Sequence, residues 1–309
     1  MSIDKLKRVF SGVTDYDAWT LQLLKIKNSK RSGTSYLCRE ITLSPEGQLK
    51  EFISEIKDYY TDSAKGRLKW YAGIREYDGS LLDRNIYKID SERDLIKIEL
   101  KSLIEAIANP DVEIDPLEFR AQGYLLKGMV TIDGDECPVK IISLQNPVTT
   151  LKHKFMRAKG TFKAISDKVI SLRTAVDVLV IDDTVYMLNL SGEKLFNMER
   201  AYKAVCDEKL GCIRASDIVS DFEAFSDIAS KGHNPRKFVS FNDEHLKKLK
   251  NVRTRNKIAK KFNIPLVEDK FDTTKIGTTD KIVKLLCDRG MLNPFDNNPR
   301  EVDGAKKWQ

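Results

Sequence analysis

The densest run of positive charge in the sequence lies between residues 247 and 261. Eight Lys and Arg side chains occur in these fifteen residues without one acidic residue. A cation set against a phosphate releases condensed counterions, so a row of cations binds nucleic acid without regard to sequence and with a steep salt dependence. We interpret the run as a DNA contact formed by Lys247, Lys248, Lys250, Arg253, Arg255, Lys257, Lys260 and Lys261. An acidic protein partner, anionic lipid head groups and a merely solvated face are the alternatives.

A second basic run precedes the β-rich centre of the chain. Its cations are separated only by small, polar or apolar residues, and they are Lys152, Lys154, Arg157 and Lys159. Two basic runs can line one groove that follows a nucleic-acid backbone. We expect both runs to contact DNA if the fold brings them together.

One acidic motif supports a different class of function. Glu99-Leu100-Lys101 matches the acid-x-lysine pattern of a large class of metal-dependent nucleases, with Asp90 or Asp94 upstream. Phosphodiester cleavage with metal needs clustered carboxylates near a cation. In that class, however, the motif lies on a strand, whereas the apolar spacing here predicts a helix. A nuclease is therefore the alternative, and we expect no catalytic residues.

Outside this acidic motif, the sequence has no motif for metal binding, redox chemistry, nucleotide binding or acyl transfer. The three histidines have no metal-ligand spacing with another His or Cys, and Cys206 and Cys212 do not form a Cys-x-x-Cys pair. There is no phosphate-binding P-loop, dinucleotide fingerprint or nucleophile elbow. We expect no metal and no cofactor.

The distribution of charge along the chain favours a polyanionic partner. The net charge is +7. Residues 1–150 hold 22 Lys/Arg and 24 Asp/Glu, a net of −2, while residues 151–309 hold 31 and 22, a net of +9. The excess positive charge lies entirely in the second half, and such asymmetry is an argument about partners rather than fold.

The sequence has no pattern of a membrane span, a signal peptide or a disulfide framework, and this bears on the cellular compartment. No apolar run approaches the roughly 18 to 20 residues of a membrane span, and the charged first ten residues precede no apolar segment of a signal peptide. Five scattered cysteines argue against a disulfide framework. We expect a cytoplasmic protein.

The main basic run has the signals of a helix. Asn242 is a suitable N-cap, and Asp243 and Glu244 follow where negative charge favours the helix dipole. We predict one helix from Asn242 to Phe262 that docks through a narrow apolar seam of Leu246, Leu249, Val252, Ile258 and Phe262. A helix-turn-helix formed by residues 253–262 and 281–292 is less favoured, because their connection is far longer than that motif uses.

The remaining pattern predicts an α/β fold of the α+β kind, with mixed or antiparallel sheets and packed helices. Hairpins are expected around Asp133-Gly134 and between residues 176–181 and 185–188, and a helix is expected from a capping box at Ser91 to about Ala108. Asn146-Pro147 is the candidate boundary between an N-terminal α/β domain, residues 1–147, and a C-terminal domain of β-hairpin and basic helices, residues 148–309.

One segment resembles a known bacterial family. The resemblance lies in the strands Val176 to Leu188, in Lys194-Leu195-Phe196 and in a following helix that carries Tyr202, which are similar to those of the family that includes the KwaB component of the Kiwa anti-phage defence system. The similarity extends over most of the chain in the length and order of its elements. The resemblance implies a cytosolic, commonly homodimeric protein that binds double-stranded DNA and works with a small membrane-spanning partner of the KwaA kind at the inner membrane. It implies no catalytic residues, so the DNA-contacting residues above come from charge alone.

Overall fold

The chain folds into two compact units in a computed structural model. The structure describes residues 2–12, 18–29, 33–45, 47–80, 84–111, 119–132, 134–145, 148–150, 155–158, 161–164, 168–182, 184–292 and 299–301. Unit 1 comprises Met1–Glu76 and Asp83–Asn197, and unit 2 comprises Tyr77–Leu82 and Met198–Gln309. The sequence placed the division at residues 147–148, whereas these units divide after Asn197.

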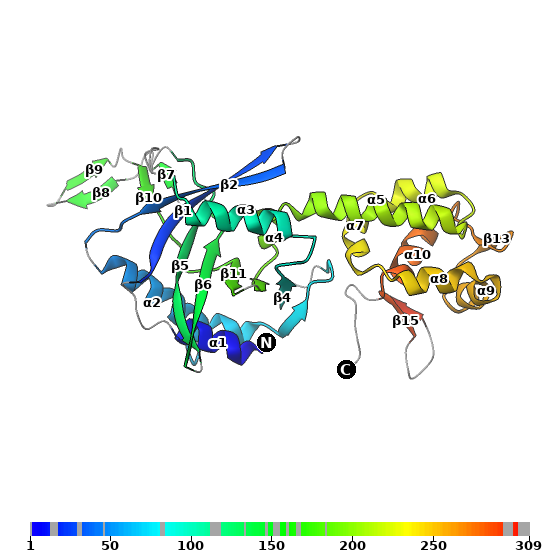
Figure 1. Ribbon diagram of the computed structural model, residues 1–309, viewed down its shortest axis with the longest axis horizontal. Helices are drawn as coiled ribbons and strands as arrows, with labels where there is room; N and C mark the ends of the chain where they lie inside the picture. The colour runs from blue at the N-terminus through cyan, green and yellow to red at the C-terminus, as the bar shows by residue number, and fades with distance from the viewer. Residues whose placement is uncertain are drawn as a thin grey trace. The chain divides into compact units, whose positions relative to one another are not determined.

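Unit 1 is built on an eight-stranded sheet with the order β2-β1-β5-β6-β11-β12-β4-β3 (Figure 1). All neighbours are antiparallel except β3 and β4. The strands are β1 (Thr20–Ser29), β2 (Gly33–Ile41), β3 (Gly73–Glu76), β4 (Asn85–Asp90), β5 (Gly123–Ile132), β6 (Asp135–Ser143), β11 (Val178–Ile181) and β12 (Thr184–Met187). This mixed sheet with packed helices confirms the predicted fold class.

Both predicted hairpins are present, and the second explains where unit 1 ends. β5 pairs with β6, and β11 pairs with β12. β11 also pairs with β6, from Val178 opposite Ile142 to Ile181 opposite Val139. The chain between them forms two small sheets, β7 (Val148–Thr150) with β10 (Lys168–Ile170) and β8 (Phe155–Ala158) with β9 (Thr161–Ala164). The sheet thus continues across the predicted boundary.

Helices cover both faces of this sheet. α1 (Ile3–Ser11) and α2 (Gln48–Thr61) bury apolar side chains against one face together with the short η1 (Arg67–Trp70). On the other face, Gln22 of β1 donates from Nε2 to the carbonyl of Ile107 in α3 (Lys97–Ala108) at 3.2 Å. The four residues of β11, Val178–Ile181, are all buried, as expected for a strand that is covered on both faces of its sheet.

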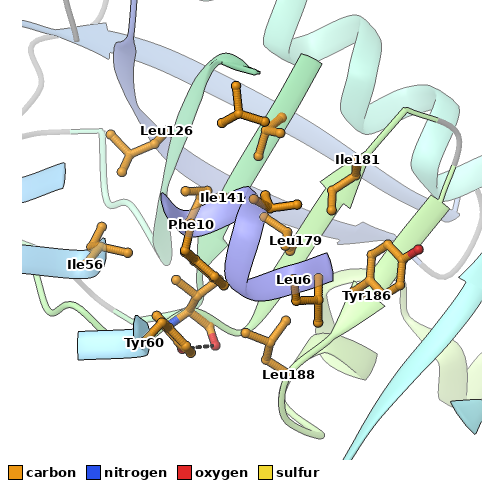
Figure 2. Close-up of a cluster of buried hydrophobic side chains, with 14 of the residues drawn as sticks. Leu6, Phe10, Ile56, Tyr60, Leu126, Ile141, Leu179, Ile181, Tyr186 and Leu188 are labelled. Atoms are coloured by element: carbon orange, nitrogen blue, oxygen red, sulfur yellow. Dashed lines mark hydrogen bonds between the residues drawn. The ribbon is translucent and has the colours of Figure 1, made fainter. Parts of the chain in front are cut away.

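The main core of unit 1 lies under α1 and α2. Figure 2 shows Phe10 and Tyr60 in one cluster with the sheet residues Leu126, Ile141 and Leu179. The rings of Phe10 and Tyr60 stack with centroids 4.4 Å apart. Packing of this kind, rather than helix propensity, holds amphipathic helices of this length in place.

Unit 2 is mainly helical around a second core. Its elements are α5 (Met198–Ser216), α6 (Phe222–Ala229), α7 (Asn234–Lys237), η2 (Phe238–Ser240), α8 (Asp243–Lys250), α9 (Val252–Lys261), β13 (Leu266–Val267), β14 (Lys270–Phe271), α10 (Thr278–Leu286), β15 (Gly290–Leu292) and β16 (Pro299–Glu301), preceded by α4 (Gly192–Leu195) of unit 1. The helix-turn-helix alternative fails, because the β13–β14 hairpin separates α9 from α10. Among the described helices, none is both long and apolar enough to cross a bilayer.

Unit 2 also includes a segment from between strands β3 and β4. Arg289 donates from Nη2 to the carbonyl of Asp78 at 2.9 Å, and the hydroxyls of Tyr77 and Tyr202 are hydrogen-bonded. Arg236 donates to the Tyr77 hydroxyl at 3.3 Å. The unit that carries the basic run is therefore assembled from two separate stretches of chain.

Candidate nucleic-acid interface

The main basic run forms two consecutive helices, α8 and α9, rather than one (Figure 1). Asn242 caps α8 as predicted, since its side-chain oxygen accepts from the backbone N–H groups of Glu244 at 3.0 Å and His245 at 3.3 Å. Asn251 then leaves the helical conformation, with φ −76° and ψ 118°, and caps α9 by accepting from Thr254 N–H at 3.0 Å. Asparagine suits this role because its short side chain satisfies orphan N–H groups at a helix start.

The break at Asn251 changes which side chains face the core. Leu246 and Leu249 are buried as predicted, and Ile258 and Phe262 pack at the edge of the core. Val252 is 42% exposed, so its predicted place in the apolar seam is wrong. Because Asn251 is extended, α9 begins as a new helix. The 3.6-residue spacing of buried side chains in α8 therefore does not continue into α9.

Four cations share the outward face of α9. Arg253, Lys257, Lys260 and Lys261 are all exposed, and their spacing of four, seven and eight residues places them together on a helix. The opposite face of α9 carries the buried residue Ala259. This face can lie along a phosphate backbone while the helix remains docked on its unit.

The exposed cations of α8 add to the positive surface that the α9 cations form. Lys247, Lys248 and Lys250 are exposed. Within the part of the chain that the structure describes, Lys247 is the only one of the three with an ion-pair partner, its Nζ lying 3.8 Å from Glu244 Oε1. We call the seven exposed cations the α8–α9 surface: Lys247, Lys248, Lys250, Arg253, Lys257, Lys260 and Lys261.

Few cations of the α8–α9 surface have ionic partners. Within the described residues, six of its seven cations form no ion pair. Elsewhere in the unit, Lys203 pairs with Glu199, Arg214 with Glu223, Lys231 with Asp227 and Lys270 with Asp217. Charge left unneutralised on a surface repels itself and attracts polyanions.

Arg255 is the exception among the eight predicted contacts. Its side chain is buried, with the residue only 5% exposed. The guanidinium donates from Nη1 to the Leu249 carbonyl at 2.9 Å and from Nε to the Asp269 carbonyl at 2.6 Å. Arg255 therefore holds α8, α9 and the β13–β14 hairpin together, and we leave it out of the DNA-binding surface.

The second predicted run falls largely outside the described residues. Lys152, Lys154 and Lys159 lie there. Arg157 belongs to β8, where the structure describes the backbone pairing with Phe162 of β9. The contribution of these four residues to DNA binding stays a prediction.

The residues of the nuclease motif lie on a helix, as their spacing predicted. Glu99 and Lys101 belong to α3, where side chains two positions apart are separated by about 200° around the axis. The helix starts at Lys97 with Ile96 at its N-cap, so the predicted capping box at Ser91 is wrong. The Asp90 carboxylate instead accepts from Glu92 N–H at 2.9 Å. Over the described part of the chain, no three His, Cys, Asp or Glu side chains are grouped as metal ligands.

The comparison with protein families matches one of them. Residues 139–292 match the family described as Kiwa protein KwaB-like. The matched range runs from β6 through unit 2 to β15 and includes the whole α8–α9 surface. No curated protein and no solved structure matches the chain. The chain thus resembles KwaB over this range, as its sequence indicated.

Proposed function

We propose that this protein is a component of a Kiwa-type anti-phage defence system that binds duplex DNA through the phosphate backbone. The family match supports the defence role. The observation that carries DNA binding is the α8–α9 surface, in which seven exposed cations cover two consecutive helices and six of them have no ion pair among the described residues. A surface of this kind binds phosphates without reading bases.

The mode of binding follows from the side chains present. Lys and Arg supply the charge of the α8–α9 surface, and Phe, Tyr and Trp, which stack on unpaired bases, are missing from the sequence of α8 and α9. Double-stranded DNA is therefore favoured over a single strand, whose binding relies on stacking. We expect similar affinity for unrelated duplexes.

The experiment is a titration of two unrelated duplexes at several salt concentrations. If all seven cations contact phosphates, log Kobs falls with log salt with a slope of about −6. A salt-independent affinity, or strong preference for one duplex, contradicts the proposal. Binding to anionic vesicles without binding to DNA assigns the surface to a membrane instead.

Binding rather than cleavage is the proposed activity. The acid and lysine of the Glu99-Leu100-Lys101 motif diverge on a helix, so they cannot act together on one scissile phosphate as they do on a strand. Supercoiled plasmid incubated with the protein and Mg²⁺ or Mn²⁺ should remain intact. Nicking that disappears in Glu99→Ala contradicts this and restores the nuclease alternative.

The partners implied by the resemblance complete the proposal. We propose a cytoplasmic homodimer that a small membrane-spanning partner, KwaA-like, recruits to the inner membrane. Fractionation of cells that express the protein with and without this partner tests recruitment. The protein should pellet with membranes only when the partner is present.

A further inference from the structure

A second group of cations lies in unit 1 on the segments next to Trp70 and to its neighbour Arg84. It lies on the loop before η1, on η1 itself, on the edge strand β3 and just before β4. We call it the Trp70 cluster: Lys65, Arg67, Lys69, Arg75 and Arg84, of which Arg67 and Arg84 lie near the indole of Trp70. It lies outside residues 139–292, so the family match says nothing about it.

Two guanidinium groups lie near the indole of Trp70. Arg67 Cζ is 3.9 Å from the ring centroid of Trp70, and Arg84 Cζ is 5.8 Å from the same centroid. Arg84 also donates from Nε to the Trp70 carbonyl at 3.3 Å. Cation–π contacts of this kind orient the planar donors before any ligand arrives.

The loop that presents the cluster has a fixed shape. The Asp62 carboxylate accepts from the N–H groups of Ala64 at 2.7 Å and Lys65 at 2.6 Å, and these bonds lower the pKa of Asp62. Gly66 follows, where a Cβ atom would lie 2.5 Å from the Asp62 carbonyl oxygen. Only glycine fits this turn, which places Arg67 at the start of η1.

Within the described residues one carboxylate interacts with the charge of the cluster, because the backbone hydrogen bonds from Lys65 and Ala64, and beside them the charge of Lys69, lower the pKa of Asp62. None of the five cations of the cluster forms an ion pair within the described residues. The nearby carboxylates already have partners, since Asp62 caps its own loop and Glu76 pairs with Lys88 at 3.1 Å. Five unpaired cations within one short region favour an external anion.

We propose that the Trp70 cluster is a second site for the phosphate backbone of DNA. The proposal rests on the proposed function, because it adds a contact in unit 1 to the α8–α9 surface of unit 2. Guanidinium groups oriented by an aromatic ring match the geometry of phosphate oxygens. A bilayer is less suited, because Trp70 and Ile74 pack against the core of unit 1 and are not available to enter lipid.

The test combines Arg67→Gln with Arg75→Gln and measures duplex affinity at several salt concentrations. Loss of two phosphate contacts should make the slope of log Kobs against log salt shallower by about 1.8. The matched control is Lys7→Gln with Lys101→Gln, which removes the same charge from exposed positions on α1 and α3 of the same unit. Equal slopes in the two double variants overturn the inference.

Trp70 supplies an independent readout. In a Trp308→Phe background, Trp19 and Trp70 are the remaining tryptophans, and Trp19 is buried. Saturating duplex should change the emission of this protein, and Trp70→Phe should abolish the change. An unchanged emission overturns the inference, as does a response to anionic vesicles but not to DNA.

The two proposals fail in different ways. If no duplex binds at any salt concentration, the proposed function itself fails. If duplex binds through the α8–α9 surface while the Arg67→Gln, Arg75→Gln variant behaves as its control, the Trp70 cluster alone is excluded.

Discussion

The Arg255 guanidinium donates a hydrogen bond from Nη1 to the carbonyl oxygen of Leu249 at 2.9 Å, across the break between α8 and α9. Its Nε donates to Asp269, at the tip of the β13–β14 hairpin. One buried side chain thereby donates to two backbone carbonyl groups. These bonds join the end of α8, the start of α9 and the hairpin turn.

Replacing Arg255 should destabilise unit 2. Arg255→Met keeps an unbranched apolar side chain but leaves the Leu249 and Asp269 carbonyls without donors. Each lost bond of this kind costs about 1–3 kcal/mol. We expect the free energy of unfolding to fall by about 2–4 kcal/mol in urea titrations.

The control for Arg255 is its neighbour Arg253, which is exposed on the same helix. Arg253→Met should change the free energy of unfolding by less than about 0.5 kcal/mol. It should weaken DNA binding, whereas Arg255→Met acts mainly on stability. Equal stability of the two variants would show that the Arg255 hydrogen bonds are not formed in solution.

Asn251 should matter as a cap rather than as a polar surface residue. Asn251→Ala removes the side-chain acceptor of Thr254 N–H and should lower the free energy of unfolding by about 1 kcal/mol. Asn251→Ser, which retains an acceptor, should recover most of the loss. Chemical denaturation measures both. A continuous helix through this position would make Asn251→Ala neutral or stabilising, because alanine is the better helix former.

Tyr60 should stabilise unit 1 through its hydroxyl. The hydroxyl accepts from Val176 N–H at 2.8 Å and donates to the Val176 carbonyl at 3.2 Å. Burial raises the pKa of Tyr60 above its usual value, so the hydroxyl stays protonated across the physiological range. Tyr60→Phe should cost about 1–3 kcal/mol, since a buried N–H loses its partner.

Tyr59 is the matched control for Tyr60, because it is adjacent on α2 and 40% exposed. Tyr59→Phe should leave the thermal midpoint of unfolding nearly unchanged, while Tyr60→Phe lowers it. Coincident melting curves for the two variants would contradict the hydrogen bonds to Val176.

Local signals in the sequence predicted the local elements well. The Asp133-Gly134 turn with its flanking apolar runs gave the β5–β6 hairpin, and Asn242 before two acidic residues gave the start of α8. Strand pairing between distant segments has no such local signal. The pairing of β11 with β6 extends unit 1 to Asn197, and nothing in the spacing around Asn146-Pro147 indicates it.

The sequence indicated which residues form the candidate site better than it indicated how the helices arrange them. Clustered cations identified the α8–α9 region, yet the helix break was missed because apolar spacing before and after Asn251 fits one continuous helix. Asn251 with Thr254 three residues later is the pattern of an N-cap within the run. Arg255 was missed because a charge count treats every cation as exposed, although Ala259 four residues later marks a closely packed face.

The α8–α9 surface is tested most directly by charge reversal on the outward face of α9. The variant combines Arg253→Glu, Lys257→Glu and Lys260→Glu. Its matched control combines Arg200→Glu, Arg214→Glu and Lys231→Glu, which are exposed cations elsewhere in unit 2 with the same total change in charge. Melting curves establish that both variants fold.

The deciding measurement is the affinity of each variant for two unrelated duplexes as a function of salt concentration. We expect the α9 variant to lose affinity for both duplexes by at least about tenfold and to show a slope shallower by about 2.7, because three phosphate contacts are lost. The control variant should keep most of the affinity and the original slope. Equal affinities and slopes in two well-folded variants would contradict DNA binding through α8 and α9.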